Sequence, residues 1–377
     1  MGKWQSSVAN QMLINRRTIS TKFWRGKRVF ITGHTGFKGS WLTFWLLSMG
    51  ANVTGYSLEP NTNPSIFKIL GLEKLITHII GNICNYSSLE KALSKAKPEI
   101  ILHLAAQPIV SKGYEDPIGT FETNIMGVVN LLEICRHISG INSILIVSSD
   151  KCYQNFDTGT PFKISDPLGG DDPYSASKAG TEIIVGSYLK SYFNKKDSPV
   201  LASARAGNVV GGGDWSKNRL LPDAARSFSE NLPLKLRNPI ATRPWQHVIE
   251  PLYGYMILIQ AMHASHKFSG PWNFGPSDRN HETVGNIAKK FANFWSGNAE
   301  VLLSKEHQHW KEAKTLDLDC LETNHLLGWK PVLDLNNTLS LTADWYCKNL
   351  KTKSKHAMKQ LTLKQINDYV ENYAHNT

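Results

Sequence analysis

A glycine-rich turn between a strand pattern and a helix pattern constrains the fold more than any other feature. Residues 26–58 are typical of a buried strand, a turn, a helix and a second strand. In the turn, Gly33 permits a tight bend, Gly36 lets a pyrophosphate approach the backbone, and Gly39 lets the helix pack closely on the strand. The helix N-terminus then offers unpaired amides to an anion. This unit predicts a dinucleotide-binding site.

Strand and helix patterns continue to alternate up to residue 208, so we expect an α/β fold with a doubly wound parallel sheet of the Rossmann type. After residue 208 the alternation is less regular, which indicates a smaller C-terminal lobe that binds substrate. The predicted organisation is an N-terminal extension at 1–25, a dinucleotide-binding domain at 26–208 to which some later segments return, a mainly substrate-binding lobe at 209–350, and a basic C-terminal tail or helix at 351–377.

Polar side chains follow the apolar run that begins at Ile144. Ser149, Asp150 and Lys151 come at the carboxyl end of this predicted strand, where ligands bind in open α/β sheets. Tyr174 and Lys178 are four residues apart and lie on one face of a predicted helix. An ammonium group beside the phenol would stabilise its phenolate, and Ser149 could hold the same substrate oxygen. These five residues are the predicted catalytic group.

Composition excludes several other functions. The formal net charge is +11, but no nucleic-acid motif accompanies it, and a basic surface also attracts an anionic nucleotide. We therefore expect no nucleic-acid partner. The apolar runs are too short for a membrane span. The five cysteines are scattered without a CxxC pair, which favours a reducing cytoplasm and argues against disulfides and a metal site.

These motifs together resemble the extended short-chain dehydrogenase/reductase family, in its nucleotide-sugar dehydratase and epimerase group. The resemblance is closest to the CDP-glucose 4,6-dehydratase family and spans roughly residues 26–350. It rests on segments in the same order along the chain: His34-Thr-Gly-Phe-Lys-Gly-Ser-Trp41, Leu104-Ala-Ala-Gln-Pro108, Ser149-Asp-Lys-Cys-Tyr153, Asp172-Pro-Tyr-Ser-Ala-Ser-Lys-Ala-Gly180, Ala204-Arg-Ala-Gly-Asn-Val-Val-Gly-Gly-Gly-Asp-Trp215, Arg243-Pro-Trp-Gln-His247 and Leu327-Gly-Trp-Lys-Pro331.

The resemblance implies an internal redox cycle on CDP-glucose with NAD. Tyr174 would take the 4-hydroxyl proton as a hydride leaves C4, and water would then be lost across C5 and C6 before the hydride returns to C6. Asp150 would be the acid toward the 6-hydroxyl. Lys151 stands where relatives acting on dTDP-glucose have Glu, and it would act as the base at C5 or stabilise an enolate electrostatically. Another nucleotide-sugar dehydratase, a 4-epimerase and a non-catalytic dinucleotide sensor are the alternatives.

The resemblance also implies the binding residues. At the second strand end, many NAD enzymes have an acid, whereas this chain has Tyr56 and Ser57, with Glu59 later. No Arg stands there for the 2′-phosphate of NADP, so we expect NAD, bound more weakly than in relatives with the acid. The expected cofactor residues are Gly33, Thr35, Gly36, Phe37, Lys38, Gly39, Tyr56, Asn82, Ile83, Leu104, Ala105, Ala106, Asn124, Tyr174 and Lys178.

The substrate residues follow from charge and from family position. Arg219 and Arg243 would bind the diphosphate, because a guanidinium matches phosphate oxygens, although each could instead form a structural ion pair. The helices around Asn124 and Glu182 resemble those that pair in the homodimers of this family, so a homodimer is expected. The expected substrate residues are Gln107, Asn208, Arg219, Arg243 and His247.

Overall fold

The computed structural model describes residues 18–236, 238–276, 282–303 and 316–376. The predicted N-terminal extension lies outside the described residues as far as residue 17. From residue 18 the chain packs on the body of the protein: the Ile19 amide donates to the Tyr253 hydroxyl at 3.3 Å, and Trp24, in the short helix α2 (Thr21–Trp24), is fully buried.

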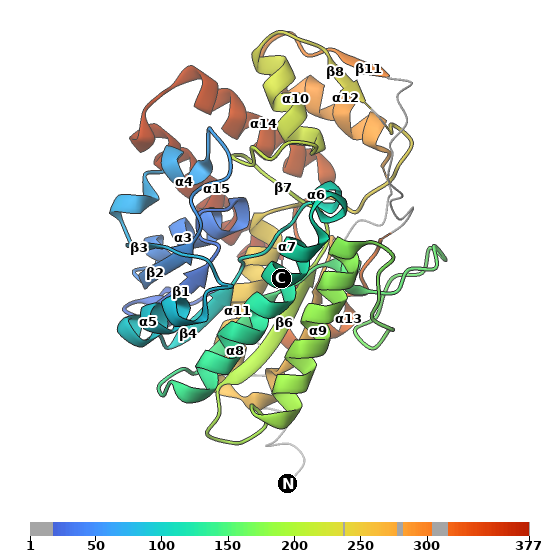
Figure 1. Cartoon of the computed structure of the whole chain (residues 1–377). Coiled ribbons are helices and arrows are strands. Elements are labelled where there is room, and N and C mark those ends of the chain that lie inside the picture. Colours follow the sequence, from blue (N-terminus) through green and yellow to red (C-terminus); the bar gives the residue numbers. More distant parts are fainter. Residues whose placement is uncertain (1–17, 237, 277–281, 304–315, 377) are drawn as a thin grey trace.

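The centre of the molecule is a seven-stranded parallel sheet with strand order β10-β6-β5-β4-β1-β2-β3 (Figure 1). The order reverses on either side of β1, which is the point where dinucleotides bind in doubly wound folds. Every residue of β5 and β6 is buried, as expected for inner strands covered on both faces. The predicted fold class is therefore confirmed. The strands are β1 (Arg28–Thr32), β2 (Asn52–Ser57), β3 (Thr77–Ile80), β4 (Ile100–His103), β5 (Ser143–Val147), β6 (Val200–Ala206) and β10 (Gly270–Phe274).

Helices cover both faces of the sheet. On one face, α8 and α9 lie in front of the strands in Figure 1 and pack with α5 over one hydrophobic cluster. On the opposite face, α3 and α11 pack over a larger cluster. Asn124 lies in a single π-helical turn, Glu122–Met126, that joins α7 to α8. The helices are α3 (Phe37–Ser48), α5 (Tyr86–Ala96), α6 (Val110–Glu115), α7 (Pro117–Phe121), α8 (Gly127–His137), α9 (Pro173–Ser191) and α11 (Ile249–Ala264).

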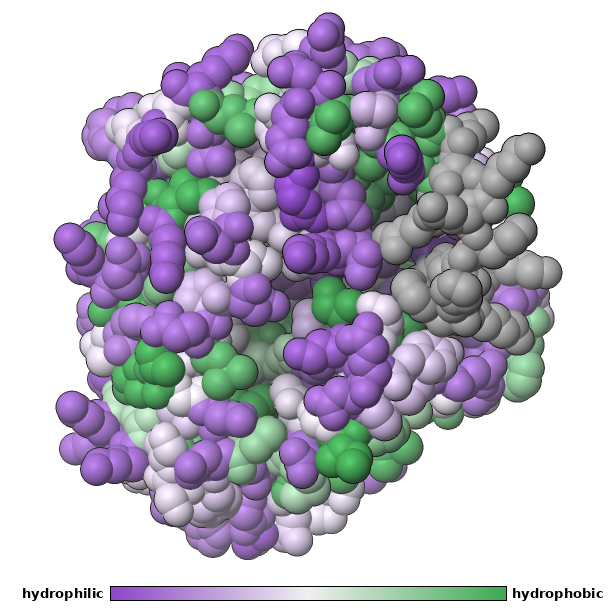
Figure 2. Space-filling view, turned by 45° about the horizontal axis from the view of Figure 1, so that its top comes forward, coloured by the Kyte–Doolittle hydropathy of each residue, from purple (hydrophilic) through white to green (hydrophobic). Residues whose placement is uncertain are grey.

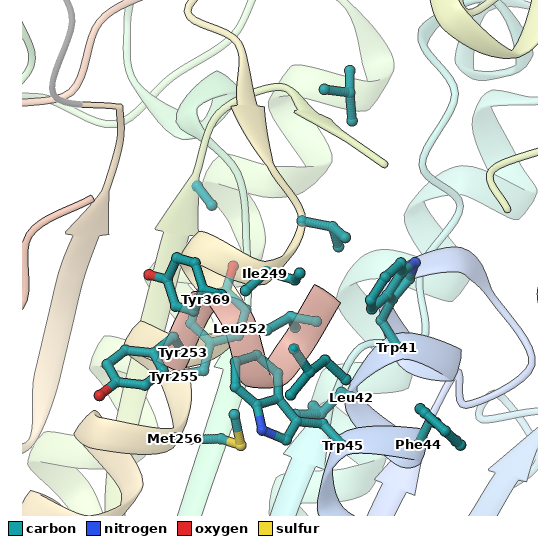
Figure 3. Close-up of a cluster of buried hydrophobic side chains, with 14 of the residues drawn as sticks. Trp41, Leu42, Phe44, Trp45, Ile249, Leu252, Tyr253, Tyr255, Met256 and Tyr369 are labelled. Carbon is teal, nitrogen blue, oxygen red and sulfur yellow. The ribbon is translucent and has the colours of Figure 1, made fainter. Parts of the chain in front are cut away.

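The C-terminal helix α15 (Lys355–Asn376) is docked on the larger core through aromatic side chains (Figure 3). The ring centroids of Tyr369 and Tyr253 are 5.4 Å apart, and those of Tyr369 and Trp45 are 6.4 Å apart. Tyr369 and Tyr373 are one helical turn apart and both buried, whereas Lys355 and Lys364 are exposed. The basic residues therefore cover the outer side of a packed helix.

The smaller lobe lies beyond the carboxyl ends of the strands (Figure 1). Its two short parallel pairs, β8 with β11 and β7 with β9, pack with helices α10, α12 and α14. The lobe is not contiguous in sequence, because α11 and β10 return to the large sheet. Its elements are β7 (Val209–Val210), α10 (Leu220–Ser229), β8 (Leu234–Leu236), β9 (Gln246–His247), α12 (Val284–Phe294), β11 (Val301–Leu303) and α14 (Leu335–Lys351).

The remaining helical segments are short, and the face of the protein drawn in Figure 2 is largely polar. Hydrophilic residues cover most of the face drawn in Figure 2, where hydrophobic residues form small, separate groups. Within the described ranges, no helix combines the length and the apolar character needed to cross a bilayer. The remaining segments are α4 (Ile66–Ile69), α13 (Leu321–Leu327) and 3-10 turns at Leu72–Lys74, Asp150–Cys152 and His266–Phe268.

Candidate active site

A cavity of about 600 Å³ lies between the carboxyl ends of the sheet strands and the smaller lobe. Its walls come from segments far apart in the chain: the glycine turn, the ends of β2, β4, β5 and β6, the start of α9, and the lobe around α10 and β8. This is the position where open α/β sheets bind their ligands, at the reversal of strand order.

The glycine turn fits a bound pyrophosphate. Gly33 has φ +74°, and a Cβ atom there would lie 2.6 Å from the Ala105 amide nitrogen. A Cβ on Gly39 would overlap the Gly33 carbonyl oxygen. Helix α3 begins directly after Gly36, and no side chain caps its first amides. These amides and the helix dipole face the cavity as an anion site that only glycine leaves open.

Ser149 organises the turn that follows β5. Its hydroxyl donates to Asp150 Oδ1 at 2.9 Å and accepts from the Lys151 amide at 3.2 Å. Helix α9 begins with Pro173, and its N-cap Asp172 accepts from the Ser175 amide at 3.0 Å. This start places Tyr174 one turn before the lysine of the same helix. All five predicted catalytic residues line the one cavity: Ser149, Asp150, Lys151, Tyr174 and Lys178.

Burial changes the protonation chemistry of these groups. It raises the pKa of Tyr174 to about 12, against the lowering effect of a hydrogen bond with Ser149. Burial lowers the pKa of Lys178 to about 8, against the raising effect of Glu182. Burial also raises the pKa of Asp150, although Lys151 and the Ser149 hydrogen bond oppose it. Deprotonation of Tyr174 therefore needs cationic support, and the Asp150 carboxyl is biased toward its protonated, proton-donating form.

Lys38 of the glycine turn interacts electrostatically with the predicted catalytic residues Lys178 and Asp150. Burial, then the charges of Lys178 and Arg219, lower its pKa to about 8, while Asp150 raises it. The Asp150 carboxyl is thus surrounded by cations from three parts of the fold. The sequence indicated Lys38 only as a cofactor contact, because its distance to Asp150 depends on how α3 and β5 meet.

Two of the expected cofactor residues do not line the cavity. Tyr56 points to the face of the sheet that α5 and α8 cover. There it is fully buried, and its hydroxyl donates to the Asn82 carbonyl at 3.1 Å. Side chains alternate along β2, so Ser57 and the residues after it form the cavity wall instead. Asn124 is buried behind the wall and donates to Ser177 Oγ at 2.8 Å. The other expected cofactor residues all line the cavity.

Two of the expected substrate residues, Gln107 and His247, also do not line the cavity. Gln107 is tied to Asn124, whose side-chain oxygen accepts from the Gln107 amide at 2.8 Å. This contact joins the end of β4 to the π-helical turn. His247 is fully buried against the edge of Trp41, and burial lowers its pKa to about 3. It is therefore a neutral residue of the core, and both residues support the cavity from outside.

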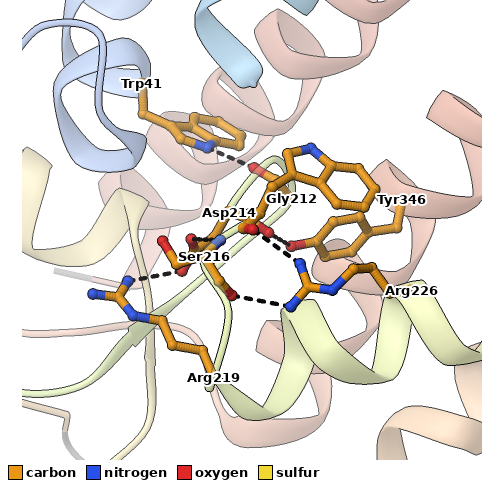
Figure 4. A network of polar contacts seen from close by, with 8 residues as sticks. Trp41, Gly212, Asp214, Ser216, Arg219, Arg226 and Tyr346 are labelled. Atoms are coloured by element: carbon orange, nitrogen blue, oxygen red, sulfur yellow. Dashed lines mark hydrogen bonds and ion pairs between the residues drawn. The ribbon is translucent and has the colours of Figure 1, made fainter. Parts of the chain in front are cut away.

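Asn208, Arg219 and Arg243 line the cavity as expected. Arg219 is also ion-paired, since its Nη1 lies 2.8 Å from Asp214 Oδ2 (Figure 4). Hydrogen bonds fix Asp214 as well. Its Oδ1 accepts from the Ser216 amide at 3.0 Å, and its backbone carbonyl accepts from the Tyr346 hydroxyl. The carboxylate fixes one edge of the guanidinium. Asp214 was missed from the sequence, where a single acid in a glycine-rich loop gives no signal of its partner.

The described residues contain no group of three or more His, Cys, Asp or Glu side chains arranged to hold a metal ion. The five cysteines are all described and carry free thiols.

Comparison with known proteins places this site in a family. Residues 30–342 match the family model described as GDP-mannose 4,6 dehydratase. The chain is 46% identical over 333 residues to the CDP-glucose 4,6-dehydratase of Salmonella typhimurium, covering 87% of this chain and 92% of that protein. It is 24% identical over 341 residues to a probable dTDP-glucose 4,6-dehydratase of Sinorhizobium fredii, covering 85% and 93%.

Solved structures agree with the fold. The UDP-glucose 4-epimerase of Thermotoga maritima, solved with UDP-glucose, has a TM-score of 0.72 at 20% identity, covering 85% of this chain and 99% of that one. The Thermus thermophilus UDP-glucose 4-epimerase, solved with NAD, has a TM-score of 0.70 at 24% identity, covering 84% and 98%. From the family model and the Salmonella relative together, the chain belongs to the GDP-mannose 4,6-dehydratase family of nucleotide-sugar enzymes.

Proposed function

We propose that this protein converts CDP-D-glucose to CDP-4-keto-6-deoxy-D-glucose with NAD, as a hydro-lyase without net oxidation. The observation that carries the proposal is the buried Asp150 carboxyl in the same cavity as Ser149 and Tyr174. An oxidation needs only the serine, tyrosine and lysine, whereas the loss of water also needs an acid. The 46% identity to the Salmonella CDP-glucose 4,6-dehydratase supports the choice of substrate.

The first half of the reaction uses the residues of β5 and α9. Tyr174 takes the proton of the sugar 4-hydroxyl, and Ser149 donates a hydrogen bond to the same oxygen. Lys178, one helical turn from Tyr174, supplies positive charge for the phenolate. NAD, when bound at the glycine turn, supplies a hydride acceptor for C4 and a hydride donor for C6.

The second half uses the turn after β5. A 4-keto group acidifies the C5 proton, and Asp150 donates a proton to the departing 6-hydroxyl. This role requires the protonated carboxyl, whose pKa burial raises. Lys151 lies beside it in the cavity and serves C5, either as the base or as a charge that stabilises an enolate. A proton returns to C5 as the hydride reaches C6.

The rim of the cavity supports NAD over NADP. After β2 the described lining residues are Ser57, Leu58, Glu59 and Asn61, and none is a cation. A 2′-phosphate would meet no positive partner there and would be repelled by Glu59. The absence of an acid at the strand end itself leaves the ribose with fewer acceptors, so we expect modest NAD affinity.

We further infer a homodimer in a reducing cytosol. Large apolar side chains are exposed on α7, on the π-helical turn and on α9: Ile118 is 72% exposed, Met126 48% and Ile183 59%. Pairing α7, α8 and α9 with the same helices of a second copy would bury them. Free thiols at all five cysteines are compatible with a reducing compartment.

The direct test is incubation of the purified protein with CDP-glucose, dTDP-glucose or GDP-mannose, with and without added NAD. A 4-keto product, detected by its absorbance in base, should form from CDP-glucose. Tyr174→Phe should lose this product by ~10²–10⁴-fold while still binding CDP-glucose in calorimetry. Turnover of another nucleotide sugar with CDP-glucose untouched would make the substrate assignment wrong, and interconversion of 4-epimers without loss of water would favour an epimerase.

A further inference from the structure

A buried ion pair lies beneath the catalytic helix. Glu182 is one helical turn after Lys178 on α9 and is 5% exposed. Its Oε2 accepts from Arg205 Nη2 at 2.7 Å and from Ser203 Oγ at 2.8 Å, and both partners belong to β6. Its Oε1 is buried without a hydrogen-bond partner among the described residues. A buried carboxylate that keeps one oxygen unpaired is costly to the fold, which calls for a functional reason.

Arg205 is itself fixed to the segment that follows the catalytic turn. Its Nη1 donates to the Tyr153 hydroxyl at 2.7 Å and to the Ile164 carbonyl at 3.1 Å. The Tyr153 hydroxyl donates to Asn273 Oδ1 at 2.7 Å, so β10 is also joined. The ion pair therefore connects the helix that carries Lys178 with the chain just after the turn at Asp150–Cys152.

The charged and titratable groups that act on Lys178 come from four elements. Lys38 of α3 repels it. His103 of β4 has a pKa lowered to about 3 by burial and is neutral, and burial raises the pKa of the Cys152 thiol, which is also neutral near pH 7. Glu182 remains as the carboxylate that opposes burial and raises the pKa of Lys178. Without it, the ammonium would face only burial and a second cation.

We infer that Glu182 is a positioning residue for catalysis: its carboxylate, one helical turn away, favours the charged form of the Lys178 ammonium, while Arg205 and Ser203 hold the carboxylate. The inference rests on the proposed function in one respect, that Lys178 serves the oxidation at C4. Arg205 has a second effect: its guanidinium pairs with a carboxylate in the core, where a buried charged group needs a partner and hydrogen bonds.

The test compares a double variant with a control. Glu182→Leu combined with Arg205→Met removes both charges and keeps apolar volume, a replacement that buried ion pairs often tolerate. Glu182→Gln removes the charge alone. Ser203→Ala is the control, since it deletes one hydrogen bond to the same carboxylate and leaves its charge. For each protein, the measurements are the pH dependence of kcat with CDP-glucose, the pH dependence of NAD affinity by tryptophan fluorescence, and the melting temperature.

Glu182→Gln should lose activity at a basic limb that lies ~1 pH unit below that of the parent, because a nearby opposite charge raises an ammonium pKa by about this much. The double variant also removes the Arg205 cation, so its limb should shift less. Ser203→Ala should keep the parent limb. A Glu182→Gln protein with an unchanged limb and only a lower melting temperature would show a purely structural pair and overturn the inference. If CDP-glucose is not the substrate, no protein, including the parent, forms the keto sugar, and the pH dependence of NAD affinity still reports on Lys178.

Discussion

The two neighbouring residues Asp150 and Lys151 have opposite tasks in the proposed elimination. Asp150 must carry a proton toward the 6-hydroxyl, and burial raises its pKa. The charges of Lys151, Lys38 and Arg243 oppose this rise. As pH rises through this elevated pKa, the proton-donating form is lost and the elimination should slow. Lys151 lies on the same turn, in position to act at C5.

Replacing Lys151 separates its two possible tasks. Lys151→Ala should abolish the exchange of solvent deuterium into C5 if the amine is the base, because no other group then removes that proton. NMR of the product, or of unreacted CDP-glucose recovered from D₂O, measures the exchange. Asp157→Asn, in an exposed loop, is the matched control and should exchange normally. Normal exchange in Lys151→Ala, with slower turnover, would exclude Lys151 as the base at C5 and leave stabilisation of the enolate as its role.

At the scale of elements, the docking of α15 depends on a buried acid in α11. Glu250 Oε1 accepts from the amides of Val332 and Leu333 at 2.8 and 2.6 Å, and Oε2 contacts the Tyr369 hydroxyl at 2.6 Å. The Glu250 side chain thus forms hydrogen bonds both with the segment before α14 and with helix α15. Burial raises the pKa of Glu250 to about 7, although these hydrogen bonds oppose the shift.

Because the pKa of Glu250 is raised in the folded protein, the stability of the fold should fall as the pH rises. The folded protein holds the Glu250 proton up to about pH 7, whereas the unfolded chain releases it near the ordinary value of 4.5. The contribution to stability is therefore complete below pH 4.5 and is lost as pH rises through about 7, on the order of 3 kcal/mol in all.

Glu250→Gln should flatten this part of the pH dependence, because the amide cannot ionise. Urea unfolding at several pH values between 5 and 8 measures it. Glu322→Gln, in α13 on the exposed surface, is the control and should follow the parent curve. A Glu250→Gln curve with the same slope as the parent would show that another group causes the loss of stability.

At the scale of the whole molecule, exposed apolar side chains gather on the helices that cover one face of the sheet. Ile118 of α7 and Ile183 of α9 are more than half exposed, while the inner sides of the same helices are buried. A second copy covering this face would remove the exposed area from water. It would also tie together the helices that carry Tyr174 and Asn124.

The dimer has a simple test. Ile118→Glu with Ile183→Lys should give monomers in light scattering at concentrations where the parent is a dimer, because charges would be buried at the interface. Leu350→Lys, in the exposed part of α14, is the control and should leave the mass unchanged. An unaltered mass in the double variant would place any interface elsewhere, and a monomeric parent would exclude the dimer.

Local patterns were enough to predict the sheet, the glycine turn and the place of the proposed catalytic residues in the cavity. Helix and strand periods, together with the strict need for glycine at Gly33, act over short stretches of chain, so the sequence by itself determined the doubly wound fold and the placement of Ser149, Tyr174 and Lys178 at strand and helix ends. Contacts between distant segments were decided only by the tertiary structure. The inward direction of Tyr56 depends on strand register, and the pairing of Arg219 with Asp214 depends on a loop conformation. The Glu182–Arg205 pair forms because α9 packs on β6, a contact that no local pattern encodes.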